Sequence, residues 1–253
     1  MKRILVPVSF SSASQNSLRH AASVFSKVQL DLLHVYPVQN YSRKYDFGDK
    51  NYTAGIRKKL QKFYLDSIEE PPKNTRLIIQ AGAISKVIDE ISNRYDLMIM
   101  SRKAHLSKKQ GHFSDKKLFI TTMSHCPVLI MPFTSTPFMF ENCEHIWHIA
   151  QRETETEVVQ EGIKRMGLTP AKMKKKSLEQ SSFLSAFWKN IVAYEKSHDK
   201  KLIKKIDAAH DEEPIDLIVL VDNEKSVFTN FFKSDVIHLF CKYDIPILVF
   251  PTK

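Results

Sequence analysis

The sequence of 253 residues contains few cysteines, few glycines and no long hydrophobic run. Its three cysteines, Cys126, Cys143 and Cys241, are odd in number and lack C-x-x-C spacing, which argues against a disulfide framework and a structural zinc site. No stretch approaches the roughly 18 consecutive apolar residues of a membrane-spanning helix, so no membrane association is expected. The apolar segment near the N-terminus is too short for a secretory signal and is interrupted by Pro7, so we expect a cytoplasmic protein.

Acidic residues are fewer than basic ones. The chain has 28 Asp and Glu against 38 Lys and Arg, which gives a net charge of +10. This charge favours anionic partners, but a solvated basic surface explains it more simply, and a nucleic-acid partner is the less favoured interpretation. The basic run "KMKKK" at 172–176 leaves the same two alternatives, because an exposed edge strand also carries lysines that block association.

Two similar phrases lie about half a chain apart: "CPVLIMP" at 126–132 and "IPILVFP" at 245–251. Before each phrase, an Asp that opens an apolar run is followed 18 positions later by the Ser of a Ser-Asp pair, namely Asp96 with Ser114 and Asp216 with Ser234. Matched spacing at several points indicates an internal duplication with a period of one domain. We therefore predict a first domain at 1–133, a linker at 134–143 and a shortened second domain at 144–253.

Short β-branched runs without polar alternation predict strands buried on both faces of a parallel sheet. The expected strands are 3–8, 30–35, 76–80, 97–100 and 128–131, and then 145–149, 173–178, 191–194, 217–221 and 247–250. Apolar stripes at helical spacing lie between them. Ser12 and Gln15 resemble a capping box for the first helix, and residues 40–55 are expected to form a loop before the second. In the second domain, helices are expected at 153–166, 200–209 and 234–243. Strands joined by helices predict a doubly wound α/β fold with right-handed crossovers.

Five phrases in order carry a family resemblance: "ILVPVSFSSAS", "LLHVYP", "AGAISKVIDEI", "DLMIMS" and "CPVLIMP". In this order and spacing, the sequence resembles the universal stress protein family in its tandem form. The resemblance covers the first domain nearly end to end and the second mainly in its last part. It implies two Rossmann-like domains of the adenine nucleotide alpha hydrolase-like type, related by a pseudo-twofold axis, and a role in the stress response.

The resemblance also implies where ATP would bind in those family members that bind it. They place it beyond the carboxyl ends of the strands, using an Asp after the first strand and a G-x2-G-x9-G-(S/T) loop after the fourth. In the first domain the three glycine positions are Ser101, Ala104 and Ser114, the hydroxyl position is Asp115, and the Asp position is Ser9. The second domain has Val221, Glu224, Ser234, Asp235 and Gln151 there. With no glycine in either set, we predict that neither domain binds ATP in the family's usual way.

Several site assignments follow for the first domain. The candidate pocket residues are Val8, Ser9, Val35, Ser101, Arg102, Lys103, Ser114 and Asp115. The basic run "SRKAHLSKK" at 101–109 could instead hold an anion through its side chains, although a solvated loop is favoured. The repeated Ser-Asp pairs are explained better as helix caps than as ligand contacts.

No nucleophile, base and orienting group can be assembled, and the histidines lack acidic or thiol companions at ligand spacing. We therefore expect a non-enzymatic protein without metal or cofactor, with ATP as a disfavoured ligand. The resemblance implies an intrachain pseudo-dimer through the last strands, with 128–130 antiparallel to 247–249; a homodimer is a further option.

Overall fold

The computed structural model describes residues 1–37, 50–102, 120–133, 138–140, 143, 145–149, 153–166, 215–222 and 244–251. The chain divides into two compact units, of which the first contains Met1–Ala104 and Met123–Phe138 and the second contains His105–Thr122 and Met139–Lys253. Each unit is described by itself. The predicted domain boundaries at 133 and 144 stay a prediction.

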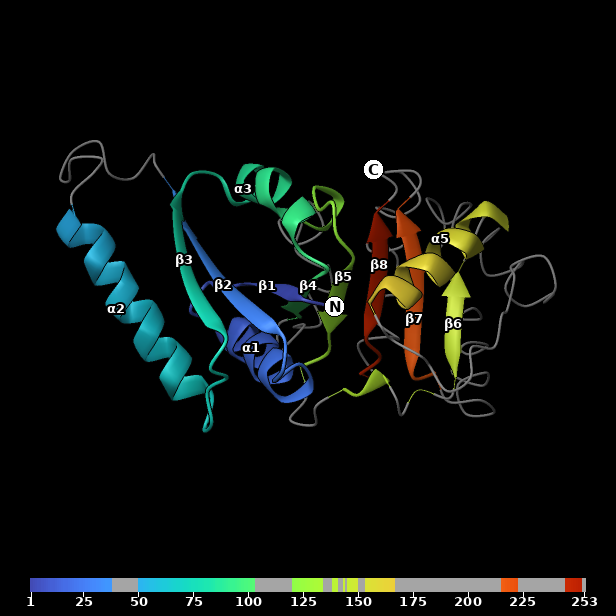
Figure 1. The fold of residues 1–253 in the computed structure, drawn as a ribbon, viewed down its shortest axis with the longest axis horizontal. Coiled ribbons are helices and arrows are strands. Elements are labelled where there is room, and N and C mark those ends of the chain that lie inside the picture. The colour runs from blue at the N-terminus through green and yellow to red at the C-terminus, as the bar shows by residue number, and fades with distance from the viewer. Residues whose placement is uncertain are drawn as a thin grey trace, which may run out of the picture. The chain divides into compact units, whose positions relative to one another are not determined.

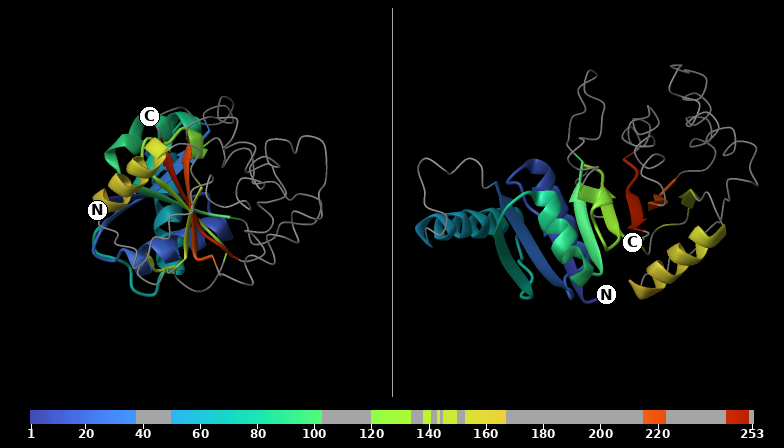
Figure 2. Two further views of the ribbon diagram at one scale, coloured as in Figure 1. Left: turned by 90° about the vertical axis from the view of Figure 1, so that its right-hand side faces the viewer. Right: turned by 90° about the horizontal axis from the view of Figure 1, so that it is seen from above.

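The first unit contains five described strands that form a parallel sheet. They are β1 (Arg3–Pro7), β2 (Gln29–Tyr36), β3 (Thr75–Ala81), β4 (Leu97–Ser101) and β5 (Val128–Met131), in the order β3-β2-β1-β4-β5. β4 and β5 are buried along their whole length, as the apolar runs predict. The strands fan out in the twist typical of such sheets (Figure 2). The doubly wound α/β fold is thereby confirmed for this unit.

The helices of the first unit are α1 (Ser12–Val24), α2 (Lys50–Ser67) and α3 (Ile84–Ile91), followed by the short turn η2 (Ser92–Arg94). In the sheet order, the step from β1 to β2 runs toward the β3 edge, whereas the step from β3 to β4 runs toward β5. Right-handed crossovers therefore place α1 and α3 on opposite faces of the sheet (Figure 1). α1 packs on β1 and β4, and α2 packs on α1 and β3.

The capping residue of α1 differs from the predicted one. Ser11, rather than Ser12, is the N-cap, and it forms the capping box with Ser14 instead of Gln15. Ser14 N–H donates to Ser11 Oγ over 3.3 Å, and Ser11 N–H donates to Ser14 Oγ over 3.0 Å. The prediction was one residue late because four serines within six positions offer two registers for the same motif.

The loop predicted at 40–55 was wrong in its last part, because α2 already begins at Lys50. Gly55 lies inside the helix, although glycine disfavours a helix interior by roughly 1 kcal/mol. Ile56, Leu60 and Tyr64, at spacings of four, are buried on one face of α2. Their packing outweighs the local preference of the segment for a loop. Residues 40–49 lie outside the described part of the chain.

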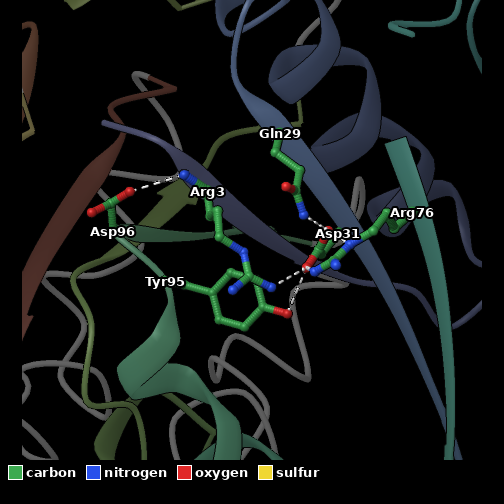
Figure 3. A network of polar contacts seen from close by, with 6 residues as sticks. All are labelled: Arg3, Gln29, Asp31, Arg76, Tyr95 and Asp96. Carbon is green, nitrogen blue, oxygen red and sulfur yellow. Dashed lines mark hydrogen bonds and ion pairs between the residues drawn. The ribbon is translucent and has the colours of Figure 1, made fainter. Parts of the chain in front are cut away.

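A buried carboxylate organises the amino ends of β1, β2 and β3. Asp31 is fully buried and accepts hydrogen bonds from Arg3 Nη2 (2.9 Å), Arg76 Nη2 (2.6 Å), Gln29 Nε2 (2.8 Å) and Tyr95 Oη (2.9 Å) (Figure 3). Burial opposes the ionisation of Asp31, but these hydrogen bonds, led by that of Arg76, outweigh it and hold its pKa well below its usual range. Burial and the bond to Asp31 raise the pKa of Tyr95 to about 12.

A second carboxylate fixes the register between β1 and β4. Asp96 Oδ2 accepts the main-chain N–H groups of Lys2 (2.6 Å) and Arg3 (2.9 Å), and Asp96 N–H donates to Arg3 O (3.0 Å). In the second unit, His145 N–H donates to Asp216 Oδ2 over 2.9 Å, and Asp216 N–H returns a bond to His145 O over 2.9 Å. Asp96 and Asp216, the matched residues of the sequence repeat, therefore play the same role.

The second unit contains β6 (Ile146–Ile149), α5 (Glu153–Arg165), β7 (Leu217–Asp222) and β8 (Ile247–Pro251). The three strands are parallel in the order β8-β7-β6. The predicted elements at 173–178, 191–194, 200–209 and 234–243 lie outside the described residues. The pairing of 128–130 with 247–249 stays a prediction. Among the described residues, no helix is long and apolar enough to cross a membrane.

Candidate functional site

The candidate site lies beyond the carboxyl ends of the strands in the first unit. Sheets of this kind bind ligands where the strand order reverses, which here falls between β1 and β4. Val8 and Ser9 follow β1, Val35 lies near the end of β2, Ser101 is the last residue of β4, and Arg102 follows it. The structure therefore brings these five candidates to one edge of the sheet. The other three, Lys103, Ser114 and Asp115, lie outside the described residues.

The first turn of α1 is occupied by its own serines. Ser9 Oγ lies 3.0 Å from Ser11 Oγ, and Ser9 N–H donates to Ser14 Oγ over 3.3 Å. Together with the capping box, these contacts engage the hydroxyl groups of Ser9, Ser11 and Ser14. Of the three, Ser9 stands at the position of the family's Asp. Ser9 therefore contributes to capping α1, and a helix N-terminus that is capped in this way offers fewer free donors to an anion.

Asn16 joins α1 to the ends of β4 and β5. Its Nδ2 donates to Ser101 Oγ over 3.0 Å and to Pro132 O over 2.8 Å, and all of these contacts are buried. Ser101 is 2% exposed and Arg102 is 6% exposed, and Arg102 N–H donates to Met131 O over 3.0 Å. Ser101, which stands at the position of the family's first glycine, thus carries a buried side chain that is hydrogen-bonded to α1. We call Asn16, Ser101 and Pro132 the Asn16 clamp.

The other end of the same edge is open. A hollow of about 560 Å³, which we call the aromatic hollow, lies between the carboxyl end of β2 and α2. It is lined by Phe10, His34, Val35, Tyr36, Pro37, Tyr52, Gly55, Ile56 and Lys59. The four residues from α2 follow the spacing i, i+3, i+4 and i+7, so they share one helix face. Of the lining residues, the sequence prediction named only Val35.

Phe10 is the centre of the ring contacts in the aromatic hollow. It adopts a left-handed backbone conformation with φ of 55°, which is uncommon for a bulky residue and turns the chain from β1 into α1. Its ring centroid lies 4.4 Å from that of His34 and 5.6 Å from that of Phe63. Lys59 Nζ lies 4.5 Å from the Phe10 centroid, which is a cation–π distance.

His34 is held in one tautomer. Its Nδ1 lies 2.8 Å from Val8 O, and because a carbonyl only accepts, Nδ1 carries the proton. Burial lowers the pKa of His34, and nearby Lys59 lowers it further, although the bond to Val8 opposes the shift. The neutral ring then has Nε2 as a hydrogen-bond acceptor.

The main chain of Val35 faces the side on which β1 ends. Val8 N–H donates to Leu33 O over 2.8 Å, whereas Gly82 N–H donates to Tyr36 O over 2.9 Å. Successive residues of a central strand form their main-chain hydrogen bonds with the neighbouring strands on alternate sides. The N–H and C=O of Val35 therefore point to the same side as those of Leu33, toward the space beyond the end of β1. A donor and an acceptor of the main chain therefore lie at the wall of the aromatic hollow.

Of the corresponding positions in the second unit, only Val221, near the end of β7, lies in the described part of the chain. Across the described ranges, no group of three or more His, Cys, Asp or Glu side chains could hold a metal ion. Cys126 and Cys143 are both buried, and burial raises the pKa of the two thiols to about 11 and about 12. Neither is a reactive thiolate at neutral pH.

A parallel sheet whose strand order reverses between β1 and β4, with helices on both faces, defines a doubly wound, Rossmann-like α/β protein. The sequence matches the universal stress protein family over residues 1–132, so the chain belongs to this family. No curated protein matches it at a significant level.

Solved structures are similar over nearly the whole chain. A universal stress protein from Archaeoglobus fulgidus has a TM-score of 0.59 at 13% identity, covering 98% of this chain and 96% of its own. A universal stress protein described as putative, from Pseudomonas aeruginosa UCBPP-PA14, has a TM-score of 0.52 at 13% identity, covering 99% and 93%. At these identities the likeness concerns the fold.

Proposed function

We propose that this chain is a non-enzymatic stress-response protein whose first unit does not bind ATP in the usual way of its family. The observation that carries the proposal is the Asn16 clamp. Ser101 stands at the first glycine position, and its buried hydroxyl accepts a hydrogen bond from Asn16 over 3.0 Å. A triphosphate would have to approach this backbone closely, which glycine permits and a packed side chain opposes.

The energetic cost of opening the clamp supports the proposal. Withdrawing Asn16 would leave Ser101 Oγ and Pro132 O without this donor, and an unsatisfied buried polar group costs about 1–3 kcal/mol. At Ser9, a neutral hydroxyl engaged with Ser11 replaces the family's carboxylate. The ligand would therefore lose a partner and displace existing hydrogen bonds.

The described residues also support a non-enzymatic role. The serine hydroxyls at the start of α1 contact one another. The Nδ1–H group of His34, the histidine of the aromatic hollow, donates a hydrogen bond to Val8 O. A nucleophile needs a base within hydrogen-bond reach, with a third group to orient that base. Within the described ranges, we find no such set.

Isothermal titration calorimetry of the full chain with ATP and ADP in the presence of Mg²⁺ tests the proposal. We expect no binding heat at micromolar nucleotide. Asn16→Ala with Ser101→Gly serves as a second variant, because it removes the clamp and restores a glycine. Micromolar binding by the unmodified chain, with a stoichiometry of one or two, would overturn the proposal.

A further inference from the structure

We propose that a groove between α1 and the end of α2 binds a short basic peptide segment of a partner protein. The groove has a volume of about 830 Å³, and all of its lining residues belong to the first unit. The lining comes from α1 and the turn after it, between Asn16 and Ser26, and from the continuous segment 65–70. We call this feature the acidic groove.

The charge of the acidic groove favours a cation. Asp66, Glu69 and Glu70 are exposed, and no ion pair joins them to another described residue. Arg19 is the single arginine or lysine of the lining, and its Nε–H group donates to the carbonyl of Ser67, the last residue of α2, over 3.1 Å. The carboxyl end of a helix is itself partly negative, so α2 adds to the field of the three carboxylates. A chain of net charge +10 thus carries a local site of the opposite sign.

His20, in the wall of the acidic groove, supplies a donor that needs an acceptor. Its side chain is 4% exposed, and its Nδ1 accepts the main-chain N–H of Phe138 over 3.3 Å. Burial lowers the pKa of His20, so the ring is neutral and its proton is on Nε2. Nε2 points away from Phe138 and has no hydrogen-bond partner within the described part of the chain. A donor left unpaired in the interior destabilises the folded chain, and a carbonyl brought by a ligand relieves this.

The apolar part of the acidic groove favours a peptide over a simple polyamine. Leu65 is 54% exposed, which makes it the most exposed large hydrophobic side chain among the described residues, and Ile68 beside it is half-buried. A basic peptide offers cationic side chains for the carboxylates, an apolar side chain for Leu65 and a main-chain carbonyl for His20. A polyamine offers only the cations. Because His20 Nε2 is buried, its contact with the peptide requires a local movement of the groove wall.

The test uses three probes: the capped peptide acetyl-Gly-Lys-Leu-Lys-Gly-amide, its analogue with glutamine in place of both lysines, and spermidine. Each is titrated into the full chain by calorimetry at low and at high salt. We expect the lysine peptide to bind about fivefold more tightly than the glutamine peptide at low salt, as for two exposed charge pairs. The difference should shrink at high salt, because exposed charges are screened.

Two surface variants separate the acidic groove from the charge of the whole chain. Glu69→Gln combined with Glu70→Gln should weaken the lysine peptide by about fivefold and leave the glutamine peptide unchanged. Glu90→Gln combined with Glu157→Gln is the matched control, because it removes the same charge from two exposed residues that do not line the groove. This control should leave the affinities of both peptides unchanged.

NMR of the isotopically labelled full chain tests the role of His20 without a substitution. The lysine peptide should shift the Nε2–H signal of His20, whereas spermidine should leave it unmoved. His20→Phe keeps a ring but removes the donor, and it should weaken the lysine peptide; if this variant does not fold, the NMR signal decides. Equal affinities of the two peptides, a double variant no different from its control, or an unmoved His20 signal at saturation would overturn the proposal. The same shift with spermidine would overturn the choice of a peptide.

Discussion

Asn16 Nδ2 donates a hydrogen bond to Ser101 Oγ over 3.0 Å and so connects the second turn of α1 to the end of β4, 85 residues away. The same amide group donates to Pro132 O over 2.8 Å. A single polar side chain therefore holds one helix against two strand ends at the edge where relatives in this fold class place ligands.

Removing this side chain should destabilise the first unit. Asn16→Ala removes the buried hydrogen bonds that Asn16 donates to Ser101 Oγ and Pro132 O, and we expect the free energy of unfolding to fall by about 1–3 kcal/mol. Urea unfolding followed by circular dichroism measures the change. Arg94→Ala, in the short turn before β4, gives a reference surface substitution, expected to stay within about 0.5 kcal/mol. A loss no larger than that of the reference would mean that the clamp contributes nothing to stability.

The N-cap of α1 can be located by comparing neighbouring serines. Ser11→Ala should cost about 1 kcal/mol, because it removes the side chain that accepts from Ser14 N–H. Ser12→Ala should be close to neutral, since Ser12 is exposed in the first turn. The opposite ranking in thermal unfolding would restore Ser12 as the cap.

The buried carboxylate of Asp31 should dominate the acid sensitivity of the first unit. Asp31→Asn at neutral pH should cost about 1–3 kcal/mol, because the buried carboxylate loses its charge-assisted hydrogen bonds to Arg3 and Arg76, whose own side chains are partly exposed. The folded-state pKa of Asp31 lies below the unfolded value, so this stability is present above the ordinary carboxyl pKa of about 4 and is lost as the pH falls through the folded pKa.

Urea unfolding at pH 7, 5 and 3 tests this account of Asp31. The difference between the unmodified chain and Asp31→Asn should stay constant from pH 7 to pH 5 and shrink at pH 3. Asp89→Asn is the control: Asp89 pairs with His125 over 3.0 Å, but both side chains are partly exposed, so its effect should stay below about 1 kcal/mol. A difference that grows on acidification would contradict the assignment.

In the second unit, Gly162 allows α5 to approach β8 closely. A Cβ at Gly162 would lie 2.1 Å from a ring carbon of Phe250, which is 2% exposed. Gly162→Ala should therefore destabilise this unit by about 1–3 kcal/mol, and Phe250→Leu in the same chain should recover part of the loss. Amide hydrogen exchange of β8 reports on this unit; unchanged protection in Gly162→Ala would exclude the close packing.

The strands β4 and β5 were predictable because each is an uninterrupted buried run. The range 128–131 agrees with β5, and 97–100 differs from β4 by one residue. The cap of α1 was missed by one position because the choice between Ser11 and Ser12 depends on three-dimensional geometry. The start of α2 was missed because the packing of Ile56 and Leu60, rather than local propensity, sets it.

The candidate site was predictable only where it lies next to a strand end. Val8, Ser9 and Ser101 follow apolar runs and could be placed at one edge from the sequence. Asn16 gave a weaker signal, a polar residue on the same helix face as the buried Ala13 and His20, which could have indicated a buried contact. Lys59 gave none, because its approach to Phe10 depends on how α2 packs against the end of β2.

Chemical-shift mapping of the isotopically labelled full chain tests most directly the claim that the Asn16 clamp closes the carboxyl end of β4 to ATP. Mg²⁺ and ATP should leave the amides of Ser9, Ser101 and Arg102 unmoved. Saturable shifts of Ser101 and Arg102 with ATP would contradict the account.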